Sequence, residues 1–133
     1  MSSNDFSTTD LDEFLKLVLE TQSSESKQAL SEKRLRKIAR NVGISDEDWE
    51  KLQKRFDDHL SKGRNFLKYE NFADAISELK IAAAIAPYRA DVLVDCGKAY
   101  YGRWKETNSN VFRDQAEALF RKALEIEPDH EEA

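Results

Sequence analysis

The second half of the sequence approximately repeats itself, and this feature limits the fold more than any other. One set of residues recurs after 34 positions, namely Gly63 as Gly97 and Phe66 as Tyr100. A second set recurs after 41 positions, namely Ala75 as Ala116, Leu79 as Phe120, Ala82 as Ala123 and Pro87 as Pro128. The two offsets differ by seven residues, as expected if one insertion lies between residues 100 and 116. A repeat of this length predicts helix pairs that stack on their neighbours, because a single pair cannot bury its own apolar face.

These spacings resemble the tetratricopeptide repeat, a helix-turn-helix unit of about 34 residues with small residues where its helices touch and a proline at its boundary. The resemblance covers residues 56–128, and the two repeats lie at about 56–89 and 90–130. The later half of the family pattern is present twice. The earlier half departs from the pattern at four positions where the family often has Trp or Leu: His59, Lys62, Leu93 and Cys96. The resemblance implies an all-α, right-handed superhelix and a non-catalytic protein-binding domain, acting as an adaptor, a scaffold or a co-chaperone-like module.

The resemblance also implies a concave groove, lined by the first helix of each pair, that binds a peptide or a helix. The groove positions of the family correspond here to Asp57, Leu60, Arg64, Leu67, Lys68, Asp91, Val94, Lys98, Tyr101 and Gly102. The cations beside apolar side chains in this set suit an acidic peptide with apolar anchors. The alternative is that these residues are the solvated ends of ordinary helices. One subgroup of the family grips acidic chaperone tails with Lys and Asn where this sequence has Leu60 and Asp95, so that ligand is not expected.

The insertion lies at about residues 102–115, between the two helices of the second repeat, and it contains Trp104. Either the two helices extend by about two turns, or a loop that carries Trp104 projects from the domain and offers a binding face. Alternatively, Trp104 packs against Tyr100 or Tyr101, one turn earlier, and closes the end of the array.

A helical extension is expected to precede the repeats and to cap the array. Apolar residues at helical spacing predict one helix over 10–20 and, after the polar segment 21–26, a second helix that ends at Gly43. A third helix is predicted to start after the N-cap residue Ser45 and to continue without a stop signal as far as Asn71. The first residues are polar, and we expect them to be disordered. The chain therefore divides into three parts: a disordered N-terminus 1–9, a helical extension 10–55 and a repeat domain 56–133.

The composition favours a helical domain without a disulfide or a membrane span. Only 4 Gly and 2 Pro occur among 133 residues, whereas 40% of the residues are hydrophobic and 35% are charged. The single cysteine, Cys96, has no partner for an internal disulfide and no leader segment opens the chain, so we expect a cytoplasmic protein. The longest apolar run, residues 81–86, is too short to cross a bilayer.

The potentially catalytic residues do not form a known arrangement in this sequence. The two histidines are His59, within a predicted helix, and His130, in the C-terminal tail. Cys96 stands at a repeat position that normally packs inside, so a buried thiol is expected rather than a reactive one. Neither a metal-ligand set nor a phosphate-binding glycine loop is present. We therefore expect no enzymatic activity, no metal and no cofactor.

Nucleic-acid binding is the alternative function, and it depends on residues 32–52. This segment has five basic residues between positions 33 and 40, and Gly43 lies where a helix-turn-helix would turn. However, the helix that would enter the DNA groove begins with Asp46, Glu47 and Asp48, which repel phosphates. The net charge of -5 also argues against nucleic-acid binding. We therefore expect a protein or a peptide as the partner, not a nucleic acid.

Self-association is a further expectation. The helix over 10–20 has a wide apolar stripe that has to be covered. Three alternatives are open: the helix folds onto the array, docks into a second copy of the chain or binds a partner. The sequence stops where a third repeat would begin, and such arrays usually need about three units. The chain is therefore a piece of a longer array, a homodimer or an array completed by its own N-terminal helices. The sequence leaves these alternatives open.

Overall fold

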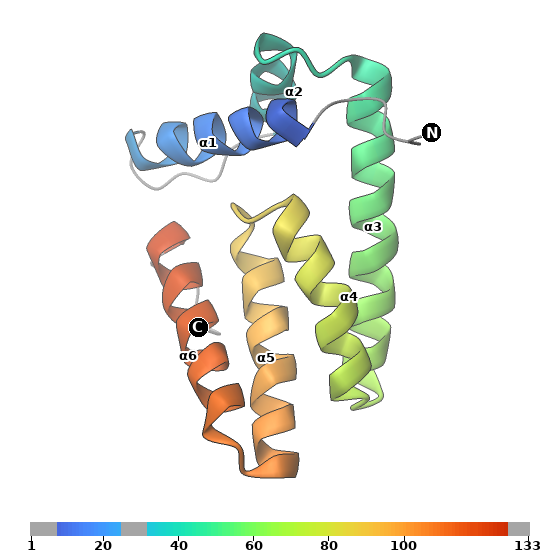
Figure 1. Cartoon of the computed structure of the whole chain (residues 1–133), viewed down its shortest axis with the longest axis vertical. Coiled ribbons are helices and arrows are strands. Elements are labelled where there is room, and N and C mark those ends of the chain that lie inside the picture. Colours follow the sequence, from blue (N-terminus) through green and yellow to red (C-terminus); the bar gives the residue numbers. More distant parts are fainter. Residues whose placement is uncertain (1–7, 25–31, 128–133) are drawn as a thin grey trace. The chain divides into compact units, whose positions relative to one another are not determined.

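The computed structural model describes residues 8–24 and 32–127, and the described residues are all-helical, as predicted (Figure 1). The helices are α1 (Thr8–Ser24), α2 (Glu32–Asn41), α3 (Asp46–Lys68), α4 (Phe72–Ile85), α5 (Ala90–Thr107) and α6 (Asn110–Ile126). The chain divides into two compact units, Met1–Lys54 and Arg55–Ala133, which we call the first and the second unit. The long helix α3 runs from the first unit into the second. No helix within the described ranges has an apolar stretch long enough to cross a membrane.

The first helix is longer at both ends than the helix predicted over 10–20, because α1 begins at residue 8 and ends at residue 24. The first part of the polar segment 21–26 is therefore helical rather than a linker. Packing of an apolar face stabilises a helix beyond what its end residues favour by themselves, and Phe14 and Val18 of α1 are fully buried. Thr8 and Thr9 belong to α1, so the predicted disorder of residues 1–9 is wrong for these two residues. The rest of that prediction, residues 1–7, lies outside the described residues, as do Pro128 and His130.

The turn between α2 and α3 has the structure that the sequence predicts. Gly43 takes a φ of 98°, which glycine adopts without the steric cost of a Cβ atom. The backbone N–H of Asp48 donates a hydrogen bond of 3.1 Å to Ser45 Oγ, the N-cap contact expected at the start of α3. α3 then continues for 23 residues, which confirms the prediction of a long third helix. Trp49 of α3 meets the ring of Phe14 edge to face, with the ring centroids 5.3 Å apart.

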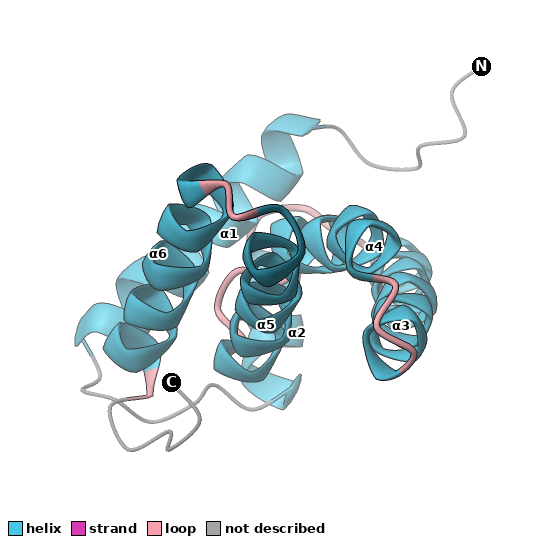
Figure 2. Cartoon of the chain, turned by 90° about the horizontal axis from the view of Figure 1, so that it is seen from below, coloured by secondary structure: helices cyan, strands magenta, loops and turns pink. Residues whose placement is uncertain are grey.

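The second unit consists of two helix pairs with related interfaces. The C-terminal part of α3 pairs with α4, as the contacts of Gly63 with Leu79 and of His59 with Glu78 show. α5 pairs with α6 and lies between α4 and α6 (Figures 1 and 2). A Cβ atom at Gly63 of α3 would lie 2.5 Å from Leu79 Cδ2 of α4, and a Cβ atom at Gly97 of α5 would lie 2.6 Å from Phe120 Cε1 of α6. The alanines that recur after 41 residues are all buried: Ala75, Ala82, Ala116 and Ala123. The internal repeat of the sequence therefore corresponds to the same contacts in both pairs.

The insertion lengthens the helices of the second pair. α5 has 18 residues and α6 has 17, compared with 14 in α4. The turn between α5 and α6 contains only Asn108 and Ser109. Asn108 has a φ of 59°, and its backbone N–H donates a hydrogen bond of 2.6 Å to the carbonyl of Trp104, which ends α5. Of the two predicted alternatives, the insertion thus extends the helices, and Trp104 lies within α5 rather than in a loop.

Candidate functional site

The candidate site is a hollow on the second unit, between the α3–α4 turn and the C-terminal half of α5. Its volume is about 360 Å³, close to the lower limit for ligand pockets. Its lining residues are Glu70, Phe72, Lys98, Tyr101, Gly102, Lys105 and Glu106. A hollow of this size suits one or two side chains of a bound protein segment. It contains three of the predicted groove residues, namely Lys98, Tyr101 and Gly102.

An aromatic ring and a glycine form the floor of this hollow. A Cβ atom at Gly102 would overlap the ring of Phe72, so the absence of a side chain lets the start of α4 approach the backbone of α5. Gly102 is predicted to open the insertion, and in the structure it lies inside α5, at a contact between the two helix pairs. The floor of the hollow is therefore apolar and depends on the packing of the two pairs.

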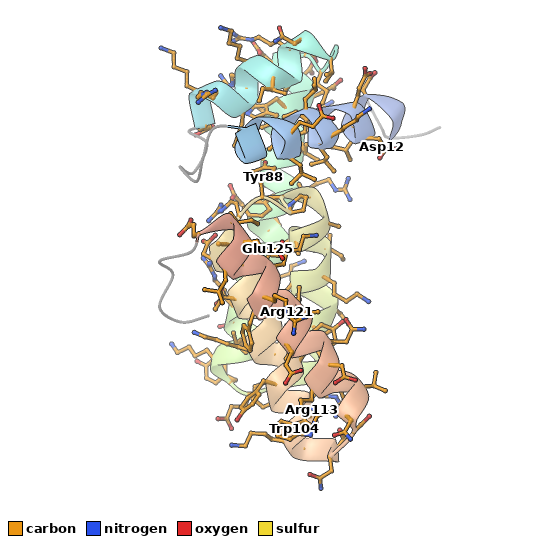
Figure 3. All side chains as sticks on the ribbon, turned by 90° about the vertical axis from the view of Figure 1, so that its left-hand side faces the viewer. Asp12, Tyr88, Trp104, Arg113, Arg121 and Glu125 are labelled. Carbon is orange, nitrogen blue, oxygen red and sulfur yellow. The ribbon has the colours of Figure 1, made fainter. Side chains whose placement is uncertain are left out.

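Two aromatic side chains of α5 continue from the hollow toward the α5–α6 turn. The side chain of Tyr101 is 44% exposed, and its ring centroid lies 5.4 Å from that of Trp104. This contact is the predicted alternative in which Trp104 packs against a tyrosine one turn earlier. The ammonium of Lys105 lies 5.6 Å from the centroid of the Tyr101 ring. Figure 3 shows Trp104 at the end of the second unit that also holds Arg113, whereas Glu125 lies toward the other end of α6.

Most charged groups of the hollow already have a partner in the fold. Glu106 accepts a hydrogen bond of 3.2 Å from Arg103, and Lys105 lies over the Tyr101 ring. Lys98 also makes an interaction within the chain. The carboxylate of Glu70, by contrast, makes no hydrogen bond or ion pair with any residue in the described part of the chain. Glu70 is exposed and follows α3 in the turn to α4.

The predicted groove residue Arg64 is held by two carboxylates of α5. Its Nε donates to Asp95 at 2.6 Å, and one of its terminal nitrogens donates to Asp91 at 3.1 Å. Arg89 donates two further hydrogen bonds to Asp91, of 3.1 and 2.6 Å. Partial burial raises the pKa of Asp91, but the hydrogen bonds and charges of Arg89 and Arg64 outweigh it and hold the pKa below its usual value. Arg64 therefore connects α3 to α5 and is not a free cation for an acidic peptide.

The remaining predicted groove residues differ in their accessibility. Asp57 and Lys68 are exposed and Leu67 is half-buried, so they lie at the surface of α3. Val94 is only 1% exposed, because it packs in a core cluster with Ala90, Leu93 and Ala123. Leu60 is 8% exposed. Val94 and Leu60 therefore stabilise the helix pairs and offer little surface to a partner, which corrects the expectation that both line an open groove.

Four residues of the hollow were not identified from the sequence: Glu70, Phe72, Lys105 and Glu106. Lys105 and Glu106 lie in the extra turns of α5, and the family pattern has no positions there. A usable signal existed for Lys105, because it lies seven residues after Lys98 and so falls on the same side of a helix. The other two residues belong to or follow a turn, where helical spacing carries no information about neighbours.

The groups considered for catalysis have structural surroundings. Cys96 is 1% exposed, and burial raises the pKa of its thiol to about 11. His59 Nδ1 of α3 lies 2.7 Å from Glu78 Oε1 of α4, so this contact joins the two helices of the first pair. Among the described residues, no group of three or more His, Cys, Asp or Glu side chains is arranged to hold a metal ion.

Two of the five basic residues of α2, Arg36 and Arg40, lie close to carboxylates of α3. Arg40 donates hydrogen bonds of 2.8 and 3.0 Å to the two carboxylate oxygens of Asp46. A terminal nitrogen of Arg36 lies 3.9 Å from Glu50. These contacts place negative charge beside two of the cations that nucleic-acid binding by residues 32–52 would use.

Comparisons of the chain with protein-family models, with curated proteins and with solved structures found no match.

Proposed function

We propose that the second unit is a pair of tetratricopeptide-like repeats that binds a segment of another protein without catalysis. The observation that carries the proposal is the contact made twice at the repeat offset, between Gly63 and Leu79 and between Gly97 and Phe120. Helix pairs that pack through such contacts and stack on one another expose the sides of their helices as binding surfaces. The proposed role is that of an adaptor or a scaffold.

The hollow beside α5 is the proposed contact point of the partner. It combines an apolar floor, the accessible ring of Tyr101 and charged groups at its rim, as peptide-binding sites commonly do. Tyr101 is the proposed anchor, because a large, partly exposed aromatic ring gains the most contact area when a partner covers it. With Arg64 held by Asp91 and Asp95, the partner need not be acidic.

The proposal is tested by selecting peptides from a displayed random library on the full-length chain and measuring their affinity by fluorescence anisotropy. Replacement of Tyr101 by alanine should weaken the selected peptides by about tenfold or more, as loss of an interface anchor does. The matched control is Tyr69→Ala, because Tyr69 is 65% exposed and does not line the hollow.

Equal affinity for the wild type and the Tyr101→Ala variant would contradict the assignment of the site, and failure to select any peptide would contradict the binding function. Light scattering of the same samples separates peptide binding from self-association, the alternative that the sequence left open. A dimer whose dissociation is required for peptide binding would place a second copy of the chain on this surface.

A further inference from the structure

The uncompensated charges at the rim of the hollow have opposite signs. The carboxylate of Glu70, in the α3–α4 turn, makes no hydrogen bond or ion pair with the described residues. The ammonium of Lys105, on α5, lies 5.6 Å from the centroid of the Tyr101 ring, which is neutral and leaves this charge uncompensated. Glu106 is offset by Arg103, and the second lysine of the lining makes an interaction within the chain. The rim therefore has one open carboxylate and one open ammonium, one from each helix pair.

A charged side chain in this hollow would meet one favourable and one unfavourable group. A lysine or arginine that pairs with Glu70 would approach Lys105, and an aspartate or glutamate that pairs with Lys105 would approach Glu70. Either charge would also lose hydration against the apolar floor formed by Phe72 and Gly102. An apolar side chain, by contrast, gains free energy when it covers the same floor. The hollow therefore favours an uncharged occupant.

The backbone of a bound segment supplies partners for both rim charges. Each residue except proline carries an N–H donor and a C=O acceptor. In an extended segment these groups point to the sides, while the side chains point to the two faces. An N–H on one side can therefore donate to Glu70, while a C=O on the other side accepts from Lys105. A helix uses most of these groups internally.

We propose that the hollow receives one large apolar side chain, Leu, Met or Phe, from an extended and locally uncharged segment of the partner. Glu70 and Lys105 hold the backbone of this segment, and the accessible ring of Tyr101 packs against the inserted side chain. Phe72 sets the size of that side chain, because its ring forms the floor. This inference rests on the proposed function, and it replaces the acidic peptide suggested by the sequence with a neutral one.

The experiment uses the peptides selected on the full-length chain. They should share one Leu, Met or Phe without a common charged neighbour, and alanine at this position should weaken binding by about tenfold or more. Added salt should change their affinity by less than about twofold, because no ion pair with the partner forms.

Methylation of single backbone nitrogens in a selected peptide tests the contact with Glu70. At one position near the apolar residue, methylation should weaken binding to the wild type by about fivefold, because the donor is lost. The same methylation should have no effect on binding to the Glu70→Ala variant, which lacks the acceptor. Methylation at the other positions is the control and should act equally on both proteins.

A change in the size of the floor tests the inserted side chain. The Phe72→Leu variant has a larger hollow, so it should raise the affinity of a Trp-containing peptide relative to its Leu-containing counterpart by about fivefold. Phe66→Leu is the matched control, because Phe66 is also half-buried but does not line the hollow, and it should leave this ratio unchanged. A ratio of two affinities for one variant does not depend on the fraction of protein that is folded.

Three outcomes would overturn the inference: selected peptides that depend on a shared charged residue, methylation effects that are equal in the wild type and Glu70→Ala, or an unchanged ratio in Phe72→Leu. If Tyr101→Ala still weakens those same peptides, the proposed function stands while this inference fails. If no peptide is selected, both fail.

Discussion

Alanine in place of Gly63 or Gly97 should destabilise the second unit, although alanine normally stabilises a helix. In an exposed helix the replacement of glycine by alanine gains about 1 kcal/mol. At Gly63 the new Cβ atom would lie 2.5 Å from Leu79 Cδ2 and 2.6 Å from Leu79 Cγ. Ordinary carbon contacts are about 3.5 to 4.0 Å, so the two helices must separate by roughly 1 Å or the leucine must leave its rotamer.

The size of the effect follows from how freely each neighbour can move. Overpacking of a core by one methyl group costs about 1 to 3 kcal/mol. Leu79 is fully buried, so Gly63→Ala should lie near the upper end of this range and destabilise by about 1 to 2 kcal/mol net. Phe120 is half-buried and can shift toward solvent, so Gly97→Ala should cost less, about 0 to 1 kcal/mol net.

Urea unfolding measures these changes, and the two tryptophans allow the second unit to be followed separately. Trp49 lies in the first unit and Trp104 in the second, so the fluorescence of a Trp49→Phe background reports on the second unit. A double-mutant cycle then isolates the contact. In a Leu79→Ala background the obstacle is gone, and Gly63→Ala should stabilise by up to about 1 kcal/mol.

A control double-mutant cycle combines Gly63 with Phe120, which belong to different helix pairs. Their coupling energy should stay below about 0.5 kcal/mol, as for independent sites. A Gly63→Ala variant that is more stable than the wild type, or a cycle with Leu79 that shows no coupling, would refute the close approach of α3 and α4 at this position. The correspondence between the sequence repeat and the two interfaces would then be lost as well.

Two further predictions concern buried groups. Because burial raises the pKa of Cys96 from 9.0 to about 11, the folded chain should react with a disulfide reagent near neutral pH about a hundredfold more slowly than the urea-unfolded chain. Because of the same pKa shift, the stability contributed by the neutral thiol is intact below pH 9.0 and is lost as the pH rises toward 11. Alkaline unfolding of the wild type and of the Cys96→Ala variant measures this loss. Rapid labelling of the folded chain, or an equal pH dependence of the two proteins, would contradict the prediction. The indole N–H of Trp49 is buried without a hydrogen-bond partner among the described residues. Trp49→Phe should therefore lower the free energy of unfolding in urea by less than about 2 kcal/mol. A larger decrease would indicate an unrecognised hydrogen-bond partner of the indole.

The sequence was informative where contacts recur at a constant offset along the chain. Gly63 and Gly97 mark helix crossings because a helix of ordinary residues cannot approach its neighbour so closely. Gly43 and Ser45 mark the ends of helices for equally local reasons, since each satisfies backbone geometry within a few residues. These features depend on neighbours in the same repeat or turn and can therefore be predicted from spacing alone.

The candidate site was less predictable because its contacts cross between the two helix pairs. Arg64 meets Asp91 and Asp95, which lie 27 and 31 residues away, and no single helix shows that these charges neutralise one another. Val94 falls on the expected side of its helix, yet it is buried in a cluster that includes Ala123 of α6, with Ala83 of α4 packed against it. Helical spacing identifies which side a residue occupies, whereas exposure depends on the distance and angle between the pairs.

The insertion connects the irregularity of the repeat to the site. Gly102, Lys105 and Glu106 all lie within the segment 102–115 and line the hollow from α5. A repeat without the insertion would end its first helix earlier and would lack the part of α5 that carries Lys105 and Glu106. The departure from regular repeat length therefore supplies about half of the hollow, while Phe72 and Glu70 from the preceding pair supply the opposite side. On this basis, the binding specificity proposed here depends on the position where the two repeats differ most, while the residues that they share hold the helices together.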